Sequence, residues 1–224
     1  MLVSNLGTVK YQNASLRRCT DLHGRVMTNE IASAPSVGAD HYRRLLEGMA
    51  KAVAEKGYAE VTIADIVAAA GVSRRTFYEH FKTKGQCLIA LYEAASANAL
   101  QVLRDAIDPS HDWEMQAEHA ISAYFGCLAQ NPLLLRTLFI EILGLGVSGL
   151  AARRRVNQEL SDFILQVVNV PTRARRGKPP LHPELAMAVV GGINELVLDF
   201  IERNRTDRLQ ELVSPSLQLV RAVT

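Results

Sequence analysis

Apolar side chains recur with a helical period along most of the chain. From residue 40 to residue 56 they return every three or four positions, and Gly57 then ends the pattern. This spacing places them on one face of an α-helix, and a glycine directly after the last apolar position is a common helix terminus. We therefore predict a first helix that begins at Asp40, as its N-cap, and ends at Gly57.

Two short helices are predicted next, joined by the sequence Ala-Gly-Val-Ser. The first begins at Thr62, and Asp65 three residues later completes a capping-box pattern. The second begins at Ser73 and continues to about His80. Gly71 between them can adopt the left-handed backbone that a tight turn requires, so the pair has the sequence form of a helix-turn-helix.

The second short helix presents two different faces. At about 100° per residue, Phe77 and Phe81 share one face, which is predicted to pack on Ile66 and Val72, while the alanines at positions 68–70 let the helices approach closely. The opposite face of such a helix enters the major groove of DNA. That face and its flanks carry Arg75, Thr76, Tyr78, Glu79 and His80.

The outward side chains have the chemistry of DNA recognition. Arg74 lies at the N-terminal end of the helix, nearest the base edges in this docking mode, and arginine can bind guanine through two hydrogen bonds. Glu79 has two interpretations: it accepts a hydrogen bond from cytosine, or it forms an exposed ion pair with Arg75, four residues away. Tyr78 also has a second interpretation, as a core residue. Three side chains suit phosphate oxygens: Thr76, Tyr78 and Lys84.

The run "VTIADIVAAAGVSRRTFYEHFKTKGQCL" is similar to the DNA-binding domain of the TetR family of bacterial transcriptional repressors. The resemblance spans roughly residues 41–90. It implies a homodimer that binds a palindromic DNA operator, and a C-terminal domain that binds a small-molecule effector. Gly85, where the family often has an acidic residue, and Val67, where alanine is common, depart from the pattern. The positions that match DNA contacts of the family are Thr62, Arg74, Arg75, Thr76, Tyr78, His80 and Lys84.

The remaining pattern is also helical, so an all-α protein is predicted. Thr83 and Gln86 form a capping-box pattern that opens a long helix to about Ile107. Further helices are predicted at 112–130, 132–145, 148–169, 182–205 and 207–222. The expected domains are a helix-turn-helix domain at 40–86 and a helical bundle for ligand binding and dimerisation at 87–224. Residues 1–39 are predicted to be a mostly disordered arm. Either this arm reaches a DNA groove, or translation begins near Met27.

The second half contains candidates for an effector site. Gly191 and Gly192 are expected to permit close packing of helices, since mid-helix glycines otherwise reduce stability. Asn194 and Glu195 then interrupt an apolar helix. They either satisfy backbone groups and rim an interface, or line the effector pocket. The predicted apolar walls, each of which is alternatively plain core, are Tyr124, Phe125, Phe139 and Phe163.

The last two helices are the predicted dimer interface. Their apolar positions are more than one subunit is expected to expose, which predicts a four-helix contact between two copies. The positions are Leu185, Val189, Leu196, Phe200, Leu212, Leu217 and Val220.

Composition and charge narrow the functional classes. The net charge is only +2, but residues 41–90 carry eight Lys/Arg against five Asp/Glu, which suits a local contact with DNA. The three cysteines lie far apart, and no catalytic, metal-ligand or nucleotide-binding motif appears. We therefore expect a cytoplasmic regulator without a cofactor, a metal, an enzymatic activity or a membrane partner. It is most simply a repressor released by its effector; the alternatives are an activator or a helical protein-interaction module.

Overall fold

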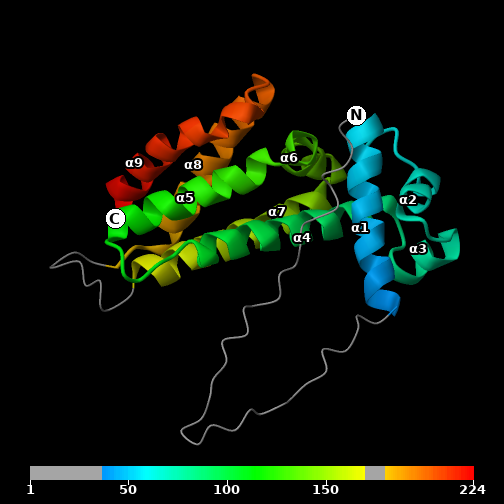
Figure 1. Ribbon diagram of the computed structural model, residues 1–224, viewed down its shortest axis with the longest axis horizontal. Coiled ribbons are helices and arrows are strands. Elements are labelled where there is room, and N and C mark those ends of the chain that lie inside the picture. Colours follow the sequence, from blue (N-terminus) through cyan, green and yellow to red (C-terminus); the bar gives the residue numbers. More distant parts are fainter. Residues whose placement is uncertain (1–36, 170–179) are drawn as a thin grey trace, which may run out of the picture. The chain divides into compact units, whose positions relative to one another are not determined.

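The computed structural model describes residues 37–169 and 180–224. Over these residues the fold is entirely helical, which confirms the predicted all-α class (Figure 1). The predicted arm lies almost wholly outside the described residues. The elements are α1 Val37–Lys56, α2 Ile63–Ala70, α3 Arg74–His80, α4 Lys84–Asp105, α5 Trp113–Ala129, α6 Pro132–Phe139, the 3₁₀ helix η1 Glu141–Leu145, α7 Val147–Val168, α8 Pro183–Glu202, the 3₁₀ helix η3 Thr206–Leu212 and α9 Val213–Val223.

The helix boundaries in the first half follow the capping residues. Gly57 ends α1 with a φ of +76°, and Gly71 ends α2 with a φ of +62°, so both predicted left-handed termini are confirmed. The capping box of Thr62 and Asp65 is also present. Asp40 as N-cap was wrong: α1 begins at Val37, and the Asp40 carboxylate lies inside the first turn, where it accepts a hydrogen bond from Arg43.

The three N-terminal helices enclose an apolar core that continues into the C-terminal half. Leu45, Ile66 and Phe77 are completely buried, and the same cluster includes Ile142 of η1 and Ala152 of α7. Figure 1 shows α1, α2 and α3 gathered at one end of α4. Since this core crosses residue 86, the domain boundary there stays a prediction.

The close approach of α1 and α2 depends on a glycine that the sequence did not single out. A Cβ on Gly48 would lie 2.6 Å from the Ile66 carbonyl oxygen and 2.9 Å from the Ala70 amide nitrogen. Of the three alanines at 68–70, only Ala70 is buried; the side chains of Ala68 and Ala69 are exposed. The small residue that lets these helices touch is therefore on α1.

Two of the predicted C-terminal helices are interrupted. The 132–145 segment is α6 followed by η1, and the 207–222 segment is η3 followed by α9. Pro215 in the first turn of α9 explains the second break, because proline lacks an amide donor and suits that turn. Gly192 does permit close packing, since its Cβ would lie 2.9 Å from Leu219 Cδ2, whereas Gly191 faces open space.

The predicted excess of exposed apolar side chains on the last helices is wrong, while the dimer interface stays a prediction. Helix α8 packs on α7, and α9 packs on α5, of the same chain (Figure 1), so most of their apolar side chains are already covered. Leu185 is exposed, at 45 %, and Leu196 is half-buried. Five of the seven proposed interface residues are buried within one chain: Val189, Phe200, Leu212, Leu217 and Val220.

Candidate DNA-binding surface and effector cavity

The recognition helix α3 is held in place by its cap and by two phenylalanines. Ser73 Oγ accepts a hydrogen bond from the Thr76 amide at 3.0 Å, and it lies 2.9 Å from Thr76 Oγ1. Phe77 is fully buried and Phe81 is 6 % exposed, which confirms that both point inward. Because the helix has under two turns, this anchoring by tertiary contacts substitutes for helix length.

The outward face of α3 is exposed, and no other element among residues 37–169 and 180–224 covers it. Arg74, Arg75 and Glu79 are exposed, and the Tyr78 ring is 57 % exposed, so Tyr78 is not a core residue. Arg75 Nε donates to Glu79 Oε1 at 3.2 Å, which confirms the ion pair; base reading by Glu79 stays a prediction. His80 turns back toward α1, where its ring stands edge-on to Tyr42 with centroids 5.9 Å apart.

Thr62 is engaged within the chain. Its hydroxyl donates to Asp65 Oδ2 at 2.7 Å, and its amide donates to the same oxygen at 2.9 Å. Lys56 Nζ lies 2.6 Å from the other carboxylate oxygen. The Lys56 ammonium, followed by the two Thr62 donors, holds the pKa of the Asp65 carboxyl well below its usual range. To donate a hydrogen bond to a DNA phosphate, the Thr62 hydroxyl would have to give up its hydrogen bond to Asp65.

The Lys84 ammonium makes three hydrogen bonds within the chain. Its ammonium donates to the carbonyl oxygens of Tyr58 and Ala59, both at 3.1 Å, and of Val61 at 2.9 Å. It also lies 4.7 Å from the centroid of the Tyr58 ring. An ammonium has three N–H donors, so these three carbonyls use all of them. Lys84 thereby fixes the α1–α2 loop to the first turn of α4, and its role as a phosphate contact stays a prediction.

Replacement of Lys84 by methionine separates these two roles. If the ammonium holds the loop, Lys84→Met lowers the free energy of unfolding by about 1–2 kcal/mol, since carbonyls lose a charged donor. The salt dependence of DNA binding then stays as in the wild type. The measurements are thermal unfolding by circular dichroism and DNA affinity as a function of salt.

The matched control is Lys82→Met, two residues earlier and exposed. It removes the same charge and is expected to change stability by less than about 0.5 kcal/mol. If Lys84→Met leaves stability unchanged and reduces the salt slope by about one, Lys84 binds phosphate and the loop contact is incidental.

An apolar cavity lies in the C-terminal bundle. Its volume is about 100 Å³, and its walls come from α5, α7 and α8, with contributions from α4 and α9. Among the described residues, no side chain that lines it is charged. The polar groups on the wall belong to Trp113, Tyr124 and Asn194. Burial raises the pKa of the Tyr124 phenol, so this hydroxyl is neutral. The cavity suits the uncharged part of a ligand.

Four of the six predicted effector residues line this cavity: Tyr124, Phe125, Phe163 and Asn194. The other two lie elsewhere. Phe139 packs against the core cluster around Phe125 and Leu135, and Glu195 is 72 % exposed, 3.9 Å from Arg153. The sequence reasoning missed Trp113, the only tryptophan of the chain, although it directly follows the N-cap residue Asp112.

Asn194 lies on the cavity wall, and its hydrogen bond is to another side chain and not to a backbone group. Its side chain is 6 % exposed and its amide nitrogen donates to Asn157 Oδ1 at 3.1 Å, which joins α8 to α7. The same residue lies on the cavity wall. A ligand that separated α7 from α8 would act directly on this hydrogen bond.

Comparisons with known proteins identify the DNA-binding domain. Residues 45–91 match the model of bacterial regulatory proteins of the tetR family. The fatty acid metabolism regulator protein of Bacillus subtilis strain 168 is 24 % identical over 183 residues, which cover 80 % of this chain and 93 % of that protein. Residues 45–91 therefore belong to the tetR family of bacterial regulatory proteins, and the chain is a DNA-binding transcriptional regulator.

Solved structures share the fold of this chain. The FadR regulator of Bacillus subtilis in complex with stearoyl-CoA has a TM-score of 0.70 at 20 % identity, over 82 % of this chain and 99 % of that one. The fatty acid degradation regulator FadR of Bacillus halodurans has a TM-score of 0.69 at 20 % identity, over 80 % and 97 %. The N-terminal helix-turn-helix followed by a helical C-terminal domain is thus the arrangement of the family.

Within 37–169 and 180–224, no helix is long and apolar enough to cross a membrane. The same residues contain no cluster of three or more His, Cys, Asp or Glu side chains that could hold a metal ion.

Proposed function

We propose that the chain is a cytoplasmic repressor, without a catalytic step, that binds a palindromic operator as a dimer and is released by a lipophilic effector. The exposed outward face of α3 supports the DNA-binding part of this proposal. Arg74, Arg75 and Tyr78 are exposed there on a helix whose opposite face is fully buried. That arrangement is what a recognition helix needs in the major groove, and it favours DNA binding over a protein-interaction module.

Dimerisation is proposed through the exposed side of α8. A Cβ on Gly191 would meet no atom within 4 Å, Leu185 is 45 % exposed, and Glu195 is 72 % exposed. These residues leave a strip of α8 uncovered in the single chain. A twofold-symmetric pair would place two recognition helices about one DNA turn apart, roughly 34–36 Å.

We propose a fatty acyl thioester as the effector. The apolar cavity supports this class, as does the stearoyl-CoA complex of a protein with the same fold. A cavity of about 100 Å³ is smaller than the roughly 150 Å³ that holds a benzene molecule. A long acyl chain therefore has to widen the space between α5, α7 and α8, and it prefers the wider form of the bundle.

The preference for a wider bundle gives the effector its influence on DNA. Leu103 on α4 lines the cavity, and Lys84 at the start of the same helix holds the α1–α2 loop. Displacement of α4 by the ligand would therefore shift the recognition helices. An effector changes DNA affinity only by its differential affinity for the two forms.

The direct test is selection of a duplex from a random-sequence library by the purified protein, followed by fluorescence anisotropy with the selected duplex. A palindromic preference with two protomers per site supports the proposal. Failure to enrich any sequence at low salt, where non-specific electrostatic attraction is strongest, would count against DNA-binding regulation.

A cavity-filling substitution tests the effector half. Ala120, which is 5 % exposed, lines the cavity, so Ala120→Leu occupies space that the acyl chain needs. We expect operator binding to persist, while the stearoyl-CoA concentration for half-maximal release rises roughly tenfold, the equivalent of about 1.4 kcal/mol. Titration of the protein–duplex complex with stearoyl-CoA, with free CoA and with stearate measures this.

The control substitution is Ala97→Leu, on the exposed side of α4, which adds the same side chain outside the cavity. It is expected to respond to stearoyl-CoA as the wild type does. If Ala120→Leu also responds like the wild type, the acyl chain does not enter this cavity. Release by free CoA alone would indicate that a different part of the ligand is recognised.

A further inference from the structure

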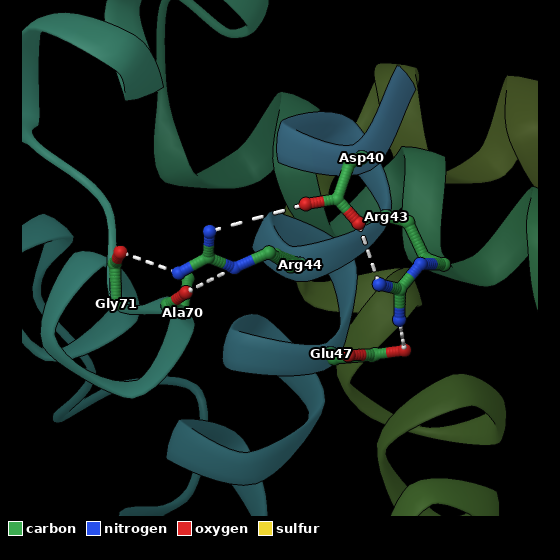
Figure 2. Close-up of polar contacts among 6 residues, drawn as sticks. All are labelled: Asp40, Arg43, Arg44, Glu47, Ala70 and Gly71. Carbon is green, nitrogen blue, oxygen red and sulfur yellow. Dashed lines mark hydrogen bonds and ion pairs between the residues drawn. The ribbon is translucent and has the colours of Figure 1, made fainter. Parts of the chain in front are cut away.

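Arg44 of α1 reaches across to the turn of the helix-turn-helix. Its Nε donates to the Ala70 carbonyl oxygen at 3.0 Å, and its Nη2 donates to the Gly71 carbonyl oxygen at 2.5 Å. Figure 2 shows the guanidinium lying between α1 and the end of α2, with both bonds on one of its edges. Two successive carbonyls are thus bound by one rigid, planar group.

These carbonyls lie where a helix end needs outside donors. The last carbonyls of a helix lack partners within it and carry partial negative charge. At the end of α2, the Gly71 amide returns to the Ala68 carbonyl and the Val72 amide to the Val67 carbonyl. The carbonyls of Ala70 and Gly71 point to α1, and Arg44 supplies their donors.

Gly71 is required for this contact as well as for the turn. Its φ of +62° lies in the left-handed region, and a Cβ there would stand 2.7 Å from Arg44 Nη2. The glycine therefore provides both the backbone conformation and the space that the guanidinium occupies. Arg44 and Gly71 form one structural unit that joins α1 to the turn.

The neighbouring arginine makes no such contact. Arg43 Nη2 donates to Asp40 Oδ1 at 2.7 Å, and its Nη1 donates to Glu47 Oε1 at 2.6 Å, so both of its partners are on α1 (Figure 2). The second Asp40 oxygen lies 3.9 Å from Arg44 Nη1. Of these two adjacent cations on α1, Arg44 bonds to the turn, whereas Arg43 bonds to carboxylates of its own helix.

We propose that Arg44 is a positioning residue for DNA recognition, which fixes the turn and thereby the direction in which α3 leaves it. The proposal rests on the operator binding proposed above. Ser73, the N-cap of α3, comes two residues after Gly71, so a displaced turn displaces Arg74 at the base edges. Binding groups have to be held within about 0.5 Å of their productive positions. Loss of Arg44 therefore reduces sequence discrimination more than general attraction to DNA.

The test compares Arg44→Ala, Arg44→Lys and the control Arg43→Ala on two duplexes. One duplex is the sequence that the wild type selects from a random library, and the other is its scrambled version. Affinity is measured by anisotropy over a series of salt concentrations. Arg44→Ala is expected to weaken binding to the selected duplex roughly tenfold or more, to leave the scrambled duplex nearly unaffected, and to keep the salt slope of the wild type.

The two other variants separate geometry from charge. Arg44→Lys keeps the charge but replaces the rigid, planar fork with a single ammonium on a flexible chain, so it is expected to lose most of the same discrimination. Arg43→Ala removes an equal charge one residue away and is expected to bind both duplexes within about twofold of the wild type. Equal losses in Arg43→Ala and Arg44→Ala would overturn the proposal in favour of a general charge effect.

The salt slope and hydrogen exchange complete the test. A slope reduced by about one in Arg44→Ala, with discrimination unchanged, would show that Arg44 binds phosphate instead.

Hydrogen exchange is measured without DNA. The amides of Gly71 and Val72 are expected to exchange faster in Arg44→Ala and Arg44→Lys than in Arg43→Ala. Equal exchange rates would overturn the proposal that Arg44 holds the turn. If the wild type selects no duplex, the proposed operator binding is contradicted, while hydrogen exchange still tests whether Arg44 holds the turn. If Arg44→Ala does not fold, Arg44→Lys is compared with Arg43→Ala instead.

Discussion

Replacement of Phe77 by alanine is expected to lower the free energy of unfolding by about 3–5 kcal/mol, the usual loss when a buried phenylalanine becomes alanine. The ring is completely buried, and its centroid lies 5.8 Å from that of Phe81 and 5.6 Å from that of Tyr78. It connects α3 to the core that α1, α2 and α4 share. Denaturation followed by circular dichroism measures the loss, and anisotropy with the selected duplex is expected to show no specific binding.

The matched control is Tyr78→Ala, the next residue on the same helix. Its ring is 57 % exposed, so its removal is expected to change stability by about 1 kcal/mol or less, while DNA affinity falls if the phenol contacts phosphate. The two substitutions thus separate the inward from the outward face of α3. A Phe77→Ala protein as stable as Tyr78→Ala would show that the recognition helix is not anchored through this ring.

Replacement of Gly149 by alanine is expected to be the most damaging change in the C-terminal half. A Cβ at this position of α7 would lie 1.8 Å from the Ile142 carbonyl oxygen of η1, and that oxygen belongs to the backbone, which cannot turn aside. Helix α7 and η1 have to separate, at a loss of about 3 kcal/mol or more. Thermal unfolding of the purified variant measures this.

The control is Gly144→Ala within η1, where an added Cβ meets no atom within 4 Å. Its stability is expected to stay within about 0.5 kcal/mol of the wild type. Equal melting temperatures for Gly149→Ala and Gly144→Ala would contradict the close packing of η1 on α7.

Separation of η1 from α7 is also expected to disturb the packing of the DNA-binding helices. Leu145 at the end of η1 lies 3.5 Å from the position that a Cβ on Gly85 would take, and the Tyr58 hydroxyl lies 3.4 Å from the same position. Gly85, one of the departures from the family pattern, therefore stands where the first turn of α4 meets both η1 and the α1–α2 loop. An acidic side chain at this position would project toward Leu145.

Local features of the fold were predictable because their causes are local. The left-handed glycine at position 71, the capping box at Thr62 and the N-cap at Ser73 depend on residues within four positions of one another. The inward direction of Phe77 and Phe81 follows from the helical period in the same way. Extension of α1 to Val37 was missed because Asp40, itself a common N-cap residue, stands just before the apolar repeat.

The sequence alone determined the helix-turn-helix, its family and the two faces of the recognition helix, since each is encoded in a short run of neighbouring residues. The tertiary structure alone decided which side chains are free to act. Lys84 and Arg44, both cations beside the DNA-binding motif, hold backbone carbonyls 23 or more residues away along the chain. It also decided that Asn194 lines the cavity while Glu195 faces outward. Such assignments depend on contacts between distant segments, which hydrophobic periodicity does not encode.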